Sequence, residues 1–226
     1  MKTTLAETFQ LLGRHLDLFT LIALTVWLPG HVAANYVQHF GPRGDGPAPS
    51  VALILMTELA FGPLVAASTI AALDRITRGM PVDYWTALHA GALAWGRLFV
   101  VRFVTGLIIV AGFLVLILPG LVLLVRYALV DAVAVLEGGN AADARRRSGD
   151  VTAGQRWEIF WTGTVLFAIV LGLNGFLATL VRVIPPLDHF VVRVLVDCVL
   201  AVAQTIFTIA LFLFYRRGAA RVPAAA

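Results

Sequence analysis

The sequence predicts an all-α, polytopic membrane bundle of six transmembrane helices with two short cytoplasmic interfacial helices. Of its 226 residues, 60% are hydrophobic and 13% are charged, whereas soluble domains average about 45–50% apolar and about 25% charged residues. The mean hydropathy is +0.89. Apolar runs repeatedly approach the roughly 20 residues that cross about 30 Å of hydrocarbon. Together these observations exclude a soluble globular enzyme, a disordered chain and a disulfide scaffold.

Six apolar segments predict six spans within a single transmembrane domain, 1–226. Their boundaries are about 18–40, 51–73, 98–118, 121–136, 159–184 and 190–215. The connector GPRGDGPAPS separates the first two segments, because closely spaced glycines and prolines do not continue a helix. The apolar stretch 98–136 is too long for one crossing at about 1.5 Å per residue. We therefore place a turn at Pro119–Gly120, and Pro185–Pro186 separates the last two spans.

Two segments between the spans predict the interfacial helices. The first lies within 74–97 and begins near Pro81, a residue that favours the first turn of a helix. The second follows Asn140, which is a favourable N-cap residue. The sequences Gly79–Asp83 and Gly139–Asp143 are similar, and each leads toward an arginine and a tryptophan before the next span. This similarity indicates either an internal duplication or a coincidence.

The basic residues predict the orientation, because short cytoplasmic loops carry an excess of Lys and Arg. With both termini inside, the cytoplasmic segments hold Lys2, Arg14, Arg75, Arg78, Arg97, Arg145, Arg146, Arg147, Arg156, Arg216, Arg217 and Arg221, and the outer connectors hold Arg43 and Arg182. This distribution predicts a multi-pass protein of the cell (inner) membrane, and the near-exclusive use of arginine over lysine is typical of an arginine-rich bacterial proteome. Alternatively, residues 32–34 would be a signal cleavage site, which would leave five spans and an outside N-terminus.

Polar residues inside the spans are the candidate binding residues, because a charge at mid-bilayer is costly unless it is paired or hydrated. Counting residues from the outer boundary places several at roughly 10–14 Å of depth, with others one turn above them. This outer polar layer contains His31, Asn35, Glu58, Arg126, Arg193 and Asp197. We expect Arg126 to pair with Glu58 or Asp197. The layer is then either a dry ion-pair network that fixes which helices meet, or a hydrated pocket or ion path.

Further charged residues suggest contacts near the inner surface. A turn at Pro119 brings Arg102 and Glu137 to one depth, which predicts a salt bridge and leaves Asp131 without a partner. The run Arg145–Arg147 is either a solvated face or a contact for anionic lipid headgroups.

Motifs for catalysis are missing from the sequence. It has no HExxH pair, nucleophile elbow, Walker loop or dinucleotide fingerprint, and its single cysteine, Cys198, cannot build a zinc cluster. The carboxylates of the outer connectors, Asp45 and Asp188, are far apart in the sequence. We therefore expect no enzyme activity, no cofactor and no catalytic or metal-binding residues.

The segment 118–157 carries a recurring pattern. It has Pro119–Gly120, an arginine in the next helix at Arg126, a glutamate at its end at Glu137, the short stretch Ala144–Ser148, then Gly154 and Trp157. The pattern resembles the bacterial six-helix membrane-domain family related to the membrane region of some glycerophosphodiester phosphodiesterases. Arg145 and Gly149 depart from it, since an apolar and an aromatic residue are usual there. The resemblance implies the architecture and no activity, because this family is largely uncharacterised.

The sequence therefore predicts a non-enzymatic helical-bundle scaffold in membrane or envelope organisation. Its expected partners are membrane lipids, with anionic headgroups at the cytoplasmic face, and a partner membrane protein or a second copy of the chain. Nucleic acid is not an expected partner. The alternative is a small transporter or channel that uses the outer polar layer.

Overall fold

The structure is a computed structural model that describes residues 2–41, 49–184 and 189–222. All regular elements in these ranges are α-helices, which confirms the predicted class. In chain order they are α1 (Lys2–Arg14), α2 (Leu16–Phe40), α3 (Pro49–Thr77), α4 (Tyr84–Val115), α5 (Ile117–Arg126), α6 (Val130–Leu136), α7 (Ala141–Val151), α8 (Arg156–Val183) and α9 (Phe190–Arg221). The outer-connector residues Arg43, Asp45, Pro185–Pro186 and Asp188 lie outside the described ranges.

Six helical segments in the described part of the chain are long and apolar enough to cross a membrane. They are Leu16–Phe40, Val51–Thr77, Tyr84–Val115, Ile117–Leu136, Arg156–Val183 and Phe190–Arg221. The fold is that of a polytopic helical membrane bundle.

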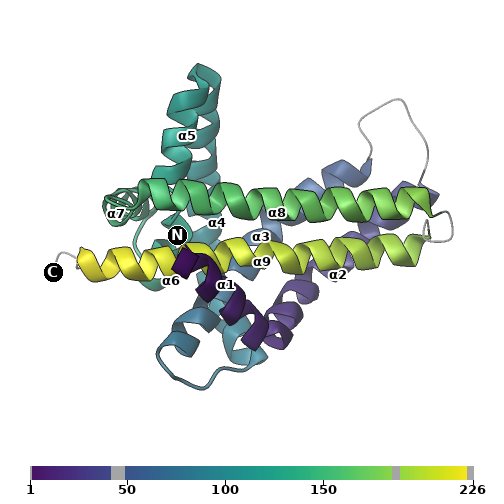
Figure 1. Ribbon diagram of the computed structural model, residues 1–226, viewed down its shortest axis with the longest axis horizontal. Helices are drawn as coiled ribbons and strands as arrows, with labels where there is room; N and C mark the ends of the chain where they lie inside the picture. The colour runs from purple at the N-terminus through teal and green to yellow at the C-terminus, as the bar shows by residue number, and fades with distance from the viewer. Residues whose placement is uncertain (1, 42–48, 185–188, 223–226) are drawn as a thin grey trace.

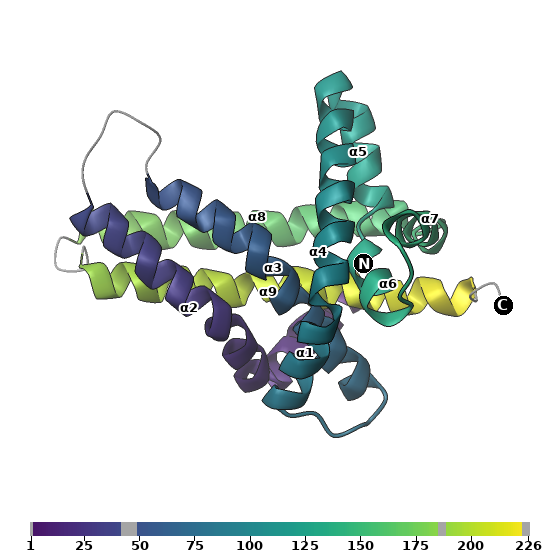
Figure 2. The same ribbon diagram turned by 180° about the vertical axis from the view of Figure 1, so that it is seen from behind.

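Two packed layers and a projecting hairpin make up the molecule (Figures 1 and 2). Helices α8 and α9 lie side by side along the longest axis, and α2 and α3 pack beside α9. The hairpin of α4 and α5 stands out from the side of the α8–α9 pair and crosses it. Helices α1, α6 and α7 all pack against the second half of α9. The hairpin and the start of α8 thus enclose a space that a parallel bundle would lack.

The buried core lies around the second half of α9. One apolar cluster joins α4, α6, α7 and α9 and contains Leu98 and Phe214. A second cluster joins α2, α3, α4 and α9 and contains Phe19 and Phe212. By contrast, the apolar side chains of 114–118 at the tip of the hairpin are exposed. Apolar groups on the outside of a membrane bundle face lipid tails and need no protein partner.

Helices α3 and α4 cross closely at Gly91. A Cβ atom at this position would lie 2.6 Å from the backbone nitrogen of Ser68, far inside van der Waals contact. Small residues permit such close approach of two backbones in membrane proteins. The crossing holds α4 in position against α3. Helix α4 in turn forms one wall of a cavity beside α8.

The first predicted interfacial helix does not form a separate element. Residues 84–97 are the first turns of α4, which continues to Val115. Each internal glycine costs a helix only about 1 kcal/mol, too little to end one that leads directly into an apolar run. Asp83 is the N-cap residue, and the hydrogen bond that Thr86 Oγ1 donates to its carboxylate lowers the pKa of Asp83.

The second short helix, α7, begins where the sequence predicts. The Oδ1 atom of Asn140 accepts hydrogen bonds from the backbone nitrogens of Ala142 at 2.8 Å and Asp143 at 3.0 Å, which confirms the N-cap. Helix α7 packs against α6 and α9 and buries Ala144 and Val151.

The two similar segments differ in structure. Gly79 and Gly139 both have a positive φ, of 68° and 81°. The first, however, leads into a long helix and the second into a short separate one.

The turn between α4 and α5 lies at Leu116, three residues before the predicted Pro119–Gly120. Proline fits the first turn of a helix, because the backbone N–H that it lacks has no partner there. Pro119 therefore belongs to α5. Gly112 and Gly120 let the two arms of the hairpin approach, since a Cβ on Gly112 would lie 3.2 Å from the Cα of Gly120 and a Cβ on Gly120 would clash with Cγ of Phe113.

Candidate functional site

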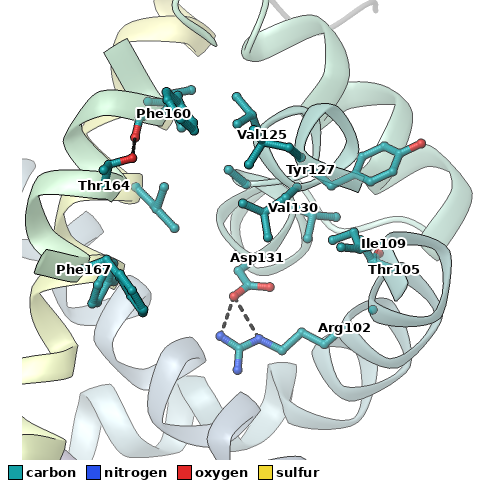
Figure 3. Close-up of a pocket in the computed structure, with 18 residues that line it drawn as sticks. Arg102, Thr105, Ile109, Val125, Tyr127, Val130, Asp131, Phe160, Thr164 and Phe167 are labelled. Carbon is teal, nitrogen blue, oxygen red and sulfur yellow. Dashed lines mark hydrogen bonds and ion pairs between the residues drawn. The ribbon is translucent and has the colours of Figure 1, made fainter. Parts of the chain in front are cut away.

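A crevice of about 620 Å³ separates the α4–α5 hairpin from the first half of α8 (Figure 3). Almost all of its lining is apolar, with Thr105, Ile109, Leu121, Leu124, Val125, Ala128 and Val130 on one side and Ile159, Phe160, Gly163, Thr164, Phe167, Phe207 and Leu211 on the other. The hydroxyl of Thr164 is not directed to the cavity, because it donates a hydrogen bond to the carbonyl of Phe160 at 2.9 Å. The volume falls within the roughly 300–1,000 Å³ of typical ligand sites.

An ion pair closes the crevice at the end opposite Phe160 and Val125 (Figure 3). The Nε and Nη2 atoms of Arg102 donate hydrogen bonds to Oδ2 of Asp131 at 2.9 Å and 2.5 Å. The pair joins α4 to α6. Asp131 therefore has a partner, contrary to the prediction.

The predicted salt bridge between Arg102 and Glu137 is wrong. Because the turn lies at Leu116, residues about fifteen positions after it face Arg102, and Asp131 occupies that position. Glu137 instead accepts a hydrogen bond from Nε of Arg147 at 2.9 Å and from the hydroxyl of Tyr215 at 2.9 Å. Glu137 thus ties α7 and α9 to the end of α6.

Glu58 approaches Arg102 from α3. A Cβ atom on Gly62 would lie 2.9 Å from Oε1 of Glu58 and 3.6 Å from Nη1 of Arg102, so both groups converge on this glycine. The same two residues line a smaller cavity of about 310 Å³ on the other side of α4. Glu58, Arg102 and Asp131 form what we call the acidic cluster, in which two carboxylates face one guanidinium.

Four of the six residues of the predicted outer polar layer come together between α2, α8 and α9. Nδ2 of Asn35 donates hydrogen bonds to Oδ2 of Asp197 at 2.7 Å and to the carbonyl of His31 at 3.0 Å. Together with Arg193, Asn35 and Asp197 line a polar cavity of about 480 Å³. Its lining also includes Gln38, Asn174 and Arg182, which the sequence analysis did not select. A lone amide within the apolar run of α8 was the available signal for Asn174.

The other two residues of the layer lie elsewhere. Glu58 joins the acidic cluster, and Arg126 lies at the end of α5 beside α7. A Cβ on Gly149 would lie 2.9 Å from Nε of Arg126, whose guanidinium carbon is 5.9 Å from the centre of the Tyr127 ring. The predicted pairing of Arg126 with Glu58 or Asp197 is therefore corrected. Equal depth along the chain does not bring residues together when the hairpin crosses the other helices.

The three consecutive arginines of α7 differ from one another. Arg147 bonds to Glu137 and donates from Nη2 to the carbonyl of Val222 at 2.7 Å. Arg145 is partly buried, and Arg146 is exposed. Among these three, Arg146 has the most open access to a membrane surface.

Within the described residues, no three His, Cys, Asp or Glu side chains are placed to hold a metal ion. Comparison with known proteins finds no matching family model, no matching curated protein and no matching solved structure. The resemblance of 118–157 to the six-helix family therefore remains a proposal that rests on the residues alone. Several of those residues hold α7 in place: Ser148 Oγ donates to the carbonyl of Arg126 at 3.0 Å, and Gly154 has a φ of 79°.

Proposed function

We propose that this chain is a non-enzymatic integral membrane protein that binds a membrane lipid in the crevice between the α4–α5 hairpin and α8. The observation that carries this proposal is the apolar lining of that crevice, which lies among helices of membrane-spanning length. An unfilled cavity forfeits dispersion contacts along its whole lining. A lipid tail supplies those contacts, and the surrounding bilayer offers it at high concentration. Bound lipid then stabilises the hairpin against α8, in keeping with a scaffold role in membrane organisation.

The proposed location is the inner membrane of a bacterium, with both termini in the cytoplasm. The arginine distribution supports this orientation. The structure adds that α1 and the end of α9 belong to one end of the molecule, because Nη2 of Arg217 donates to Oε2 of Glu7 at 2.9 Å. Reporter fusions after Arg78 and after Arg147 should both report the cytoplasm. An outside location for either fusion would refute the orientation.

Two glycines of α8 offer a direct test of lipid binding. Gly163 lines the crevice and Gly172 lies outside it, and a Cβ at either position meets nothing within 4 Å. Gly163→Trp should fill the crevice, and Gly172→Trp is the matched control. The protein is reconstituted with spin-labelled lipids, and the fraction of immobilised lipid is measured. We expect Gly163→Trp to lower this fraction and the control to leave it unchanged; equal fractions in both variants would refute the proposal.

A small transporter or channel is the alternative, and the polar cavity lined by Asn35, Arg193 and Asp197 favours it. Polar groups inside spans often mark solute or ion pathways. Asp197→Asn should then abolish a solute or proton flux in proteoliposomes without unfolding the protein. An unchanged flux in this folded variant would remove the alternative.

A further inference from the structure

We infer that the lipid in the crevice is an anionic phospholipid of the cytoplasmic leaflet, whose phosphate is held between Arg126 and Arg156. This inference rests on the proposed function and names the class of ligand. It is carried by three features: the convergence of two guanidinium groups, their position at one end of the crevice, and their unneutralised charge.

Both guanidinium groups approach Gly149 of α7. A Cβ on this residue would lie 2.9 Å from Nε and 3.5 Å from Nη2 of Arg126. From the start of α8, Nη2 of Arg156 donates a hydrogen bond to the carbonyl oxygen of Gly149 at 3.3 Å. A side chain at this position would displace the side chain of Arg126. The end of α5 and the start of α8 thus present their cations to one point on α7.

Both arginines adjoin residues that line the crevice. Arg156, Phe160 and Phe167 are spaced at intervals that place them on one face of α8, and the two phenylalanines line the crevice. On the opposite wall, Val125 and Tyr127, the neighbours of Arg126, also line it. Phe160 and Val125 lie at the end of the crevice away from the Arg102–Asp131 ion pair (Figure 3). The two arginines adjoin these residues in the sequence, since Arg156 comes one turn before Phe160 and Arg126 directly follows Val125. We therefore place both arginines just beyond that end. A phospholipid has this same sequence of an anionic head followed by an apolar chain.

The charge of the two arginines is not neutralised by the described part of the protein. Neither forms a salt bridge within residues 2–41, 49–184 and 189–222, and both side chains are exposed. The nearest acids in sequence, Asp150 and Glu158, are exposed and form no salt bridge with either arginine in these ranges. By contrast, Arg102 is neutralised by Asp131. Guanidinium groups match phosphate oxygens in geometry as well as in charge. Two cations that no described acid neutralises favour a headgroup of net negative charge over a zwitterionic one, which carries a cation of its own.

The test compares spin-labelled phosphatidylglycerol with spin-labelled phosphatidylcholine, both bound to the reconstituted full chain. In the variant Arg126→Gln/Arg156→Gln, the preference for phosphatidylglycerol should fall about thirtyfold, because two cations near an anionic headgroup are lost. The total lipid held in the crevice should stay the same. Arg146→Gln removes an exposed arginine of α7 whose atoms are not among those nearest to Gly149, and it should keep the preference. A thermal unfolding midpoint equal to that of Arg146→Gln verifies that the double variant is folded.

An unchanged preference in the double variant would overturn the inference, and so would an equal loss in Arg146→Gln, which would indicate a diffuse surface effect. Soluble glycerol phosphate provides another arm. If it displaces phosphatidylglycerol at equal concentration, the site binds free phosphate esters and the lipid inference falls. The proposed function fails separately, when Gly163→Trp leaves the total bound lipid unchanged.

Discussion

Replacing Arg102 by Gln should destabilise the protein more than replacing its partner Asp131 by Asn. Without Arg102, the two carboxylates of the acidic cluster lose the cation that the described residues bring close to them, whereas without Asp131 the guanidinium keeps Glu58 nearby. Breaking one side of a fully buried pair costs about 3–5 kcal/mol. These side chains are 32% and 24% exposed, so solvent screening reduces our expectation to about 2 kcal/mol for Arg102→Gln and about 1 kcal/mol for Asp131→Asn.

The free energy of unfolding is measured by titrating the protein from mild detergent into SDS. The double variant Arg102→Gln/Asp131→Asn completes a mutant cycle and should recover at least about 1 kcal/mol relative to the sum of the single changes. Arg78→Gln is the control, because Arg78 forms an exposed pair with Asp74 at 2.9 Å and should cost less than about 0.5 kcal/mol. Additive single changes, or a larger cost for Asp131→Asn than for Arg102→Gln, would refute the proposed arrangement of the cluster.

Two further predictions concern the supports of the site. Gly91→Ala should lower the free energy of unfolding by about 1–3 kcal/mol, because its methyl group meets the backbone of Ser68. The control, Gly96→Ala on the same helix, has open space and should be neutral or stabilising. Unfolding of both variants in detergent measures the difference, and equal effects would contradict the close crossing of α3 and α4. Asn140→Ala should lower the free energy of unfolding by about 1 kcal/mol through loss of the α7 cap. It should also speed amide hydrogen exchange at the start of α7, and an unchanged exchange rate would refute the role of Asn140 as the cap.

The sequence predicts those features of the fold that depend on composition and local chemistry. The apolar segments appear as helices because a chain in hydrocarbon must satisfy its backbone hydrogen bonds internally, which a helix of about 20 apolar residues does. The cap at Asn140 is correct because it depends only on the next three residues. The turn at Leu116 was missed because Pro119, although it ends helices in most contexts, is tolerated in a first turn.

The candidate site was less predictable, because it depends on which helices are neighbours. Asn35 and Asp197 were correctly placed in one layer, since α2 and α9 pack side by side. Arg126 has a similar depth in the sequence count, yet the hairpin carries it across the bundle to Gly149. A crossing of this kind has no signature in hydropathy, because hydropathy reports how apolar a segment is and not which helices it contacts. The crevice arises from this crossing and was therefore not predicted.

Contacts between the earliest and the latest helices constrain how the protein is made. Helix α9 packs against α1, α2 and α3, and these first helices leave the ribosome long before it. The amide of Asn35 and its acceptor Asp197 are separated by 162 residues. During synthesis, α2 enters the bilayer with a polar group whose partner has not yet been translated. Insertion of the early helices and closure of the bundle are thus separate events, and in the interval the carbonyl of His31 within α2 remains an acceptor for the amide of Asn35.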